Sequence, residues 1–309
     1  MSDHERPVEP FSDLHVEEDG HVRATLLHDP TVEACDMAIY LDGSASMGGE
    51  YEYKKEYKGF WHWMLGKPST LLPNKVEPQA RWILEYLATK DRNGQLRVAY
   101  WACGPKGKNI EYVGEMTGVN VADYQFPGPH DPGNRTELLP AIQDFVDYMR
   151  KQSMLGAKQG CGVFITDGEI HDANAVKAYC EKLAADISAK RCAKMNFILV
   201  GVGEGVNEEQ MEDICHEEYE GVGHLWCHRV AEEITQVAEL VAVLVDESMT
   251  VAAGGTIYDD KNNVIKRYEA RLPAILEFHV PRGCKSFTLE ISGQRFTQPL
   301  PSEAHASHH

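Results

Sequence analysis

The stretch DMAIYLDGSAS, residues 36–46, decides the fold of this chain. Its first part is a short, mostly apolar run that stops abruptly at Asp42 and gives way to small polar residues. Runs of the same kind recur at residues 96–103, 162–166 and 197–202. Each is rich in Val, Ile and aromatic residues and is apolar on both faces, which is typical of central strands in a parallel sheet.

Helical patterns lie between these runs. Asp172 is expected to cap the helix that follows it, and a more strictly alternating segment at residues 110–116 is expected to form an edge strand. Apolar residues at helical spacing mark residues 78–89, 138–154, 173–189, 207–216 and 231–245. Strands that alternate with helices predict an α/β fold with a doubly wound, mainly parallel sheet. In such sheets ligands bind beyond the carboxyl ends of the strands, where the strand order reverses.

After Glu247 the pattern changes to short strands divided by turn residues such as Asn262-Asn263 and Ser292-Gly293. This part is small for an independent core, and a strand predicted at residues 21–27 is expected to complete it. The expected division of the chain is an amino-terminal segment at 1–33, the α/β domain at 34–247, a small all-β module at 248–301, and a flexible tail at 302–309.

Composition restricts the classes of function. The formal net charge of -18 argues against nucleic acid and against anionic membranes, both of which attract basic surfaces. The polar amino terminus does not resemble a secretory signal, and no apolar run is long enough to span a bilayer. The eight cysteines contain no CxxC pair. Reduced thiols in a cytoplasmic protein are therefore expected.

Three separate loops offer oxygen ligands. Asp42, Ser44 and Ser46 alternate on the loop after the first strand, so that their side chains can turn towards one point. Asp167 ends a second buried strand, and Thr136 stands just before a helix in GNRTE, residues 133–137. Hydroxyl and carboxylate oxygens suit hard cations such as Mg²⁺ or Mn²⁺. The sequence therefore predicts a divalent-cation site at these five residues.

Together the five residues resemble the metal-ion-dependent adhesion site of von Willebrand factor A domains, DxSxS…T…D, and the resemblance covers roughly residues 34–246. It implies that Ser44, Ser46 and Thr136 bind the cation directly, while Asp42 and Asp167 act largely through bound waters. A carboxylate from a partner would then fill the exchangeable position. Residues 76–104 and 200–203 look most like cytoplasmic bacterial members of the tellurium-resistance type.

The complete five-residue site predicts a binding module rather than an enzyme, because the sequence offers no evident nucleophile–base set and no phosphate-binding GxxxxGK(S/T) loop. The cofactor is expected to be Mg²⁺, with Mn²⁺ or Ca²⁺ as alternatives, and the partner is expected to be a protein that offers an Asp or Glu carboxylate, in a stress or tellurium-resistance complex. One alternative is a metal-assisted hydrolase with water activated near Glu169 or His171. Another is a homo-oligomeric structural protein that assembles through the β module.

Two further segments leave alternatives open. Residues 49–74 carry many aromatic side chains, which either pack on the sheet or form a rim that grips a partner. Cysteine and histidine residues gather between residues 215 and 228, where a zinc site competes with incidental placement on a helix and a strand. Their spacing matches no common zinc finger, which favours incidental placement.

Overall fold

A computed structural model describes residues 10–17, 19–26, 34–51, 54–55, 70–71, 74–248, 250–252, 254–269, 272–291 and 293–301. The chain divides into two compact units. The larger unit comprises residues 30–245, and the smaller one comprises residues 1–29 together with residues 246–309. Among the described residues, no helix combines the length and the apolar character that crossing a bilayer requires.

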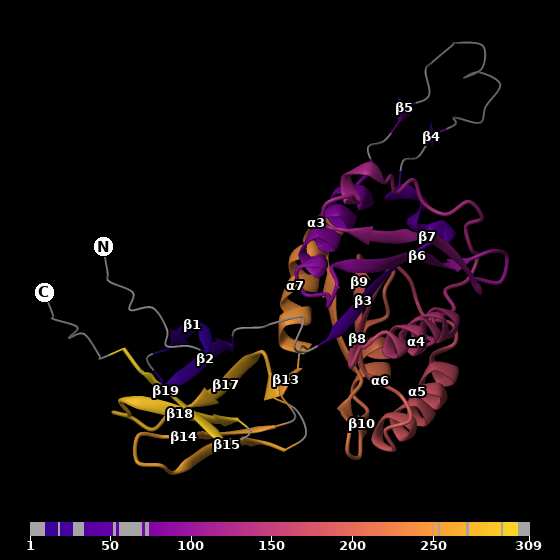
Figure 1. Cartoon of the computed structure of the whole chain (residues 1–309). Coiled ribbons are helices and arrows are strands. Elements are labelled where there is room, and N and C mark those ends of the chain that lie inside the picture. Colours follow the sequence, from indigo (N-terminus) through magenta and orange to yellow (C-terminus); the bar gives the residue numbers. More distant parts are fainter. Residues whose placement is uncertain are drawn as a thin grey trace, which may run out of the picture. The chain divides into compact units, whose positions relative to one another are not determined.

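The larger unit is built on a six-stranded sheet in the order β12-β9-β8-β3-β6-β7 (Figure 1). All neighbouring strands run parallel except β7, which pairs antiparallel with β6 at the edge. This confirms the predicted doubly wound, mainly parallel sheet. The strands are β3 (Cys35–Asp42), β6 (Gln95–Cys103), β7 (Asn109–Thr117), β8 (Gln159–Thr166), β9 (Lys194–Val202) and β12 (Trp226–Ala231).

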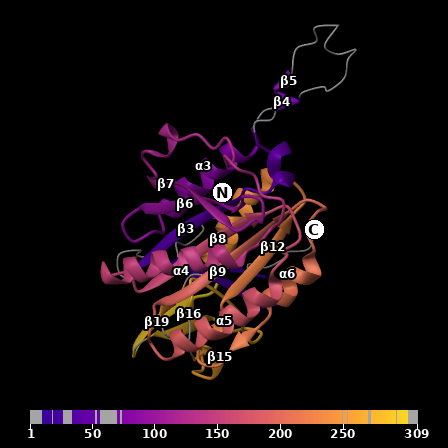
Figure 2. The same cartoon turned by 90° about the vertical axis from the view of Figure 1, so that its right-hand side faces the viewer.

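Helices cover both faces of this sheet. They are α3 (Val76–Ala88), α4 (Leu139–Met154), α5 (Ala173–Ser188), α6 (Glu208–Cys215) and α7 (Val237–Ser248). Helices α3 and α7 lie on one face, and α4, α5 and α6 lie on the other (Figures 1 and 2). Strands β3 and β8 are buried along their whole length, as the apolar runs predicted. On the α4 side the core is closed by the aromatic rings of Phe145, Phe164, Phe197 and Trp226.

One predicted helix begins later than expected. The pattern at residues 231–245 indicated a helix, but Ala231 ends β12 and α7 begins only at Val237. Between them lies a short 3-10 helix, η3 (Ile234–Gln236), with a capping box formed by Glu233 and Gln236. The capping box satisfies backbone N–H groups where the chain turns from the sheet edge, so the regular helix starts one turn further on.

The smaller unit consists of short antiparallel strands. One sheet has the order β1-β2-β17 and another the order β15-β14-β18-β19, while β13 and β16 form a separate pair. The strands are β1 (Phe11–Val16), β2 (His21–Leu26), β13 (Thr250–Ala252), β14 (Gly255–Tyr258), β15 (Val264–Tyr268), β16 (Leu272–Pro273), β17 (Ile275–His279), β18 (Ser286–Ile291) and β19 (Gln294–Pro299).

Both ends of the chain contribute to this unit. Strand β2 pairs antiparallel with β17 along its length, and its alternate residues are buried. The Phe11 ring meets Phe287 edge-on at 5.2 Å between centroids, and Phe278 meets the same ring at 4.9 Å. The core of the unit therefore joins residues that are far apart in the sequence, which is why the carboxyl-terminal strands alone looked small for a stable core.

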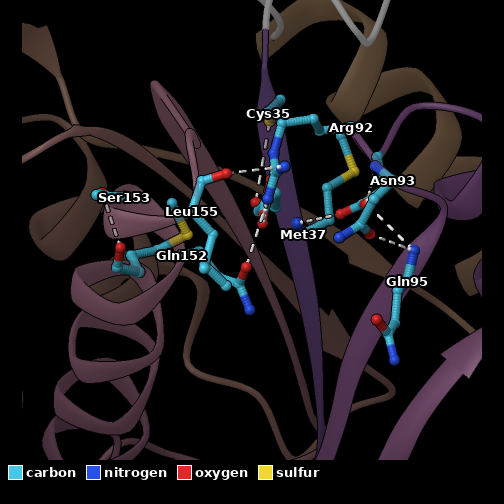
Figure 3. Close-up of polar contacts among 11 residues, drawn as sticks. Cys35, Met37, Arg92, Asn93, Gln95, Gln152, Ser153 and Leu155 are labelled. Atoms are coloured by element: carbon cyan, nitrogen blue, oxygen red, sulfur yellow. Dashed lines mark hydrogen bonds and ion pairs between the residues drawn. The ribbon is translucent and has the colours of Figure 1, made fainter.

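The amino-terminal edge of the larger sheet carries a charged cluster of Asp36, Asp91 and Arg92. Asp36 is fully buried, and its two carboxylate oxygens accept hydrogen bonds from Arg92 Nε at 2.7 Å and Nη2 at 2.9 Å. Arg92 also reaches the carbonyl oxygen of Leu155 and the side chain of Gln152 at the end of α4 (Figure 3). Burial raises the pKa of Asp91 to about 6, although its carboxylate accepts hydrogen bonds from backbone N–H groups.

Four more short strands complete the described chain. They form two antiparallel pairs, β4 (Lys54–Lys55) with β5 (Thr70–Leu71) and β10 (Glu218–Tyr219) with β11 (Gly223–His224). Most of the aromatic segment at residues 49–74 lies outside the described residues. Its two alternative roles therefore stay predictions.

Candidate metal centre

Asp42 and Thr166 end two neighbouring parallel strands, β3 and β8, whose register pairs Leu41 with Ile165. Strands β6 and β7 lie on one side of β3, and β8, β9 and β12 lie on the other. The strand order therefore reverses between β3 and β8. This is the position at which doubly wound sheets bind ligands, and the chain places its oxygen-rich loops there.

The loop after β3 holds Asp42 in a fixed position. Asp42 is fully buried, and its Oδ1 accepts a hydrogen bond from the Ser44 backbone N–H at 2.6 Å. Its Oδ2 accepts a hydrogen bond from the Thr166 hydroxyl at 2.6 Å. Between them, Gly43 has no room for a side chain, because a Cβ there would lie 2.7 Å from the Cys103 sulfur and 2.9 Å from a backbone oxygen of Trp101.

Polar contacts through Ser44 and Ser46 connect Asp42 with Asp167. The hydroxyl oxygens of Ser44 and Ser46 lie 2.9 Å apart. The Ser46 hydroxyl donates a hydrogen bond to Asp167 Oδ1 at 2.7 Å. Four of the five predicted site residues are thus joined by short polar contacts at one edge of the sheet.

Thr136 reaches the same place through backbone contacts. The Ala45 N–H donates to the Gly133 carbonyl oxygen at 2.8 Å, and the Gly133 N–H donates to the Gly43 carbonyl oxygen at 3.0 Å, so the Thr136 loop lies along the serine loop. Thr136 is 4% exposed. A Cβ added at Gly168 would lie 3.4 Å from the Thr136 hydroxyl oxygen, which places that hydroxyl beside the Asp167 loop.

The site brings two negative charges close together. Burial raises the pKa of Asp42 to about 6, and the nearby charge of Asp167 adds to the shift. Burial also raises the pKa of Asp167. The hydrogen bonds to the two carboxylates come from hydroxyl and backbone N–H groups, with no Lys or Arg partner among the described residues. One buried carboxylate, one partly buried carboxylate and three hydroxyls, without a basic partner among the described residues, fit a hard divalent cation.

The donor set is rich in hydroxyls rather than in conventional ligands. Within the described part of the chain, no group of three or more His, Cys, Asp or Glu side chains is arranged to hold a metal ion. The oxygen set at residues 42–46, 136 and 167 is of a different kind, because only two of its members are carboxylates. Neutral hydroxyl ligands favour Mg²⁺ or Mn²⁺ over softer metals.

Sequence reasoning missed several residues that build the site. Thr166 orients Asp42, and the Tyr51 hydroxyl donates to the Asp42 carbonyl oxygen at 2.7 Å. The signal for Thr166 was its position, since a polar residue ends an otherwise apolar buried strand next to Asp167. Tyr51 had no such signal, because it lies nine residues beyond Asp42 at the start of the aromatic segment.

The predicted role of Asp172 is wrong. It stands at the start of α5, but its side chain makes no capping hydrogen bond to that helix. Its Oδ1 and Oδ2 instead accept hydrogen bonds from the backbone N–H groups of Leu138 and Leu139, at 2.8 and 2.9 Å. The loop after β8 lies against the first turn of α4, whose N–H groups have no partner within their own helix, and the carboxylate satisfies those.

Among known proteins, similarity is found at the level of structure. No family model matches the chain, and no curated protein matches its sequence. The chain is similar to a von Willebrand factor type A protein from Catenulispora acidiphila, with 12% identity over 96% of this chain and 73% of that chain and a TM-score of 0.44.

Two further solved structures show the same likeness. Manganese-loaded TRAP protein from Plasmodium vivax shares 12% identity over 96% of this chain and 95% of that chain, with a TM-score of 0.40. The VWA domain of SpRpn10 shares 11% identity over 69% of this chain and 94% of that chain, with a TM-score of 0.41. The neighbours thus include von Willebrand factor A domains.

Proposed function

We propose that this chain is a divalent-cation-dependent protein-binding module of the von Willebrand factor A type. Ser44, Ser46 and Thr136 would hold Mg²⁺ or Mn²⁺ directly, and Asp42 and Asp167 would act through bound water. The observation that carries the proposal is the convergence of the buried Asp42 carboxylate, the partly buried Asp167 carboxylate and three hydroxyls where the strand order reverses, with no basic partner among the described residues.

The chemistry of this donor set favours binding over catalysis. When bound, the cation would supply an electrophilic position that a carboxylate oxygen of a partner can fill. The residues of this chain keep that position available, because their hydroxyls are neutral and do not quench the positive charge. Asp42, held by Ser44 and Thr166, keeps its negative charge behind the serine loop.

The charge of the whole chain narrows the class of partner. A net charge of -18 repels an acidic protein at long range. Salt limits this repulsion to a Debye length of about 8 Å at physiological ionic strength. The expected partner therefore offers one Asp or Glu to the cation from a surface that is otherwise neutral or basic.

Titration calorimetry tests the proposal directly. Chelator-stripped protein is titrated with Mg²⁺, Mn²⁺ and Ca²⁺, beside Asp167→Ala and a matched control, Asp147→Ala. Asp147 is exposed and pairs with Arg150 on α4. We expect one saturable site in the wild type and in the control, and its loss in Asp167→Ala. A wild-type protein that binds none of the three ions, with or without acetate as a carboxylate ligand, would overturn the proposal.

A finer assignment follows from the resemblance of residues 76–104, which form α3 and β6, to tellurium-resistance-type members. We propose an adaptor role in a cytoplasmic stress or toxic-anion resistance complex. Deletion of the gene in its host should increase sensitivity to tellurite, and complementation with Asp167→Ala should fail where the wild type succeeds. Equal resistance of the deletion strain and its parent would rule out this pathway without touching the cation site.

A further inference from the structure

The loop at residues 167–172, between β8 and α5, is bound to the backbone of Thr136 by one residue, His171. The Thr136 N–H donates a hydrogen bond to His171 Nδ1 at 3.1 Å. In return, the His171 N–H donates to the Thr136 carbonyl oxygen at 2.9 Å. Both backbone polar groups of Thr136 are therefore bound by a single residue of the loop that carries Asp167.

Two more contacts anchor this loop on either side of His171. Asp172 accepts the N–H groups of Leu138 and Leu139, just after Thr136. On the other side, the Gln210 side-chain amide pairs with the backbone of Ile170. Its Oε1 accepts the Ile170 N–H at 2.8 Å, and its Nε2 donates to the Ile170 carbonyl oxygen at 2.8 Å. Helix α6, which carries Gln210, therefore also binds the backbone of this loop.

From these contacts we infer that His171 is a positioning residue for the cation site, because it sets where the Thr136 hydroxyl lies relative to Asp167. The inference rests on the proposed function. Once the backbone of Thr136 is held at both its N–H and its carbonyl oxygen, the hydroxyl can occupy only the few staggered positions of one torsion. Its place beside Gly168 then depends on the His171 contact.

The imidazole acts here as a hydrogen-bond acceptor. Because Nδ1 accepts the Thr136 N–H, the proton of the neutral ring lies on Nε2. This role can be isolated by substitution. The side-chain oxygen of Asn occupies nearly the same place as Nδ1, whereas the oxygen of Gln lies one bond further out. His171→Asn should keep the contact, and His171→Gln should lose it.

The surroundings allow both variants to fold. His171 is exposed and lines an open cleft of about 590 Å³ together with Asn174, Asn207 and Glu209. A longer side chain can extend into this cleft without displacing buried groups. Thermal unfolding of the metal-free proteins checks that both variants are folded to the same extent as the wild type.

The experiment measures Mn²⁺ affinity by calorimetry for the wild type, His171→Asn and His171→Gln. Loss of an outer contact to a metal-binding residue weakens affinity by roughly 10- to 100-fold, so we expect a loss of about 10-fold or more in His171→Gln. We expect His171→Asn to stay within about 3-fold of the wild type. The amide resonance and hydrogen exchange of Thr136, read by NMR without metal, should change in the Gln variant and recover in the Asn variant.

The outcomes separate this inference from the proposed function. If the wild type binds Mn²⁺ and His171→Gln binds it equally well, the positioning role is overturned and the cation site stands. If the Asn and Gln variants lose affinity equally, the acceptor at Nδ1 is not the operative group, which also overturns it. If the wild type binds no cation, the proposed function fails, and the role of His171 in cation binding fails with it.

Discussion

Strand β3 carries a buried aspartate at each end, and the two have opposite surroundings. Asp36 and Asp42 are both fully buried. At the amino-terminal edge, the Arg92 guanidinium donates hydrogen bonds to both carboxylate oxygens of Asp36. At the carboxyl-terminal edge, Asp42 receives only a hydroxyl and a backbone N–H, with a second carboxylate nearby. At the first edge the chain itself supplies the opposite charge, and at the second edge no basic side chain of the described residues pairs with Asp42.

The two ends of β3 differ in how the cost of a buried carboxylate is offset. A buried carboxylate is costly unless it is paired, and a bidentate guanidinium offsets that cost. The Asp36 carboxylate in turn raises the pKa of Arg92. The Asp42 carboxylate has no such partner, and burial raises its pKa to about 6. Metal-free protein therefore carries an electrostatic cost at the carboxyl-terminal edge that cation binding would relieve.

The largest effect is expected from Arg92→Met, which leaves Asp36 buried without its partner. Breaking a buried ion pair on one side costs about 3–5 kcal/mol of the free energy of unfolding. Urea unfolding measures it, with Arg150→Met as a matched control. Arg150 pairs with Asp147 on the surface, where side-chain exposures of 58% and 65% predict a loss below about 1 kcal/mol. Equal losses in the two variants would show that the buried pair does not secure this edge.

A pair of isosteric changes tests the contrast between the two ends of β3. Asp36→Asn removes a charged partner from Arg92 and should lower the free energy of unfolding by about 2 kcal/mol. Asp42→Asn, in chelator at pH 7.5, removes an unpaired buried charge and should leave stability unchanged or raise it by about 1 kcal/mol. Mn²⁺ should then raise the Tm of the wild type and of Asp36→Asn, but not of Asp42→Asn. Similar losses in the free energy of unfolding from both substitutions in chelator would show that Asp36 and Asp42 do not differ in their electrostatic surroundings.

The pH dependence of stability tests the amino-terminal cluster further. Burial raises the pKa of Asp91 from 3.8 to about 6, so the folded protein binds this proton more tightly than the unfolded chain does. Asp91 therefore makes the free energy of unfolding fall as pH rises from 3.8 to about 6, and adds no slope above that. The fall is on the order of 3 kcal/mol, because one pKa unit corresponds to about 1.4 kcal/mol.

Chemical unfolding in chelator across this pH range measures the slope. The wild type should show a steeper fall than Asp91→Asn, whose side chain does not titrate. Asp91→Asn should also be less stable at every pH, because an amide cannot accept all the backbone N–H groups that the carboxylate binds. Parallel pH profiles would contradict the raised pKa of Asp91.

The smallest effects are expected from adding one methyl group at either end of β8. At Gly160, near its amino-terminal end, a Cβ would lie 2.6 Å from the Met149 sulfur, so the methionine must move and Gly160→Ala should cost about 1 kcal/mol. At Gly168, just past its carboxyl-terminal end, the nearest atom is the Thr136 hydroxyl oxygen at 3.4 Å. Gly168→Ala should stay within about 0.5 kcal/mol. Thermal unfolding compares the two variants. A larger loss of stability at Gly168 than at Gly160 would show that the carboxyl-terminal end of β8 is packed as tightly as its amino-terminal end.

Much of the α/β architecture could be predicted because its signals are local. The run ending at Asp42 and those like it are apolar on both faces, as strands covered on two sides must be. The late start of α7 could not be predicted in this way. Residues 231–236 fit a helical pattern, yet Ala231 pairs with Val202 in the sheet, and that pairing overrides local propensity.

The candidate site divides in the same manner. Asp42, Ser44 and Ser46 are neighbours in sequence, so their convergence follows from one short loop. Thr136 and Asp167 were predicted from oxygen side chains at the boundaries of a helix and a strand, and the resemblance to a family motif joined them to the serine loop. The contacts of Thr166 with Asp42 and of His171 with Thr136 were not predicted. They join residues that are 124 and 35 positions apart in the sequence, and a contact over such a distance produces no repeating pattern in the sequence.

The sequence by itself determined the order of strands and helices and the kind of atoms at the carboxyl ends of β3 and β8, because burial on two faces and turn chemistry are written in adjacent residues. The tertiary structure decided which groups touch. Strand β2 pairs with β17, which lies near the other end of the sequence, and the Asp172 carboxylate binds the first turn of α4 rather than α5. Arg92 pairs with Asp36, whereas Asp42 has no basic partner among the described residues. Those choices depend on distances between segments that meet only when the sheet is complete, and the energy of a buried charge depends on the nearest partner rather than on the nearest residue in sequence.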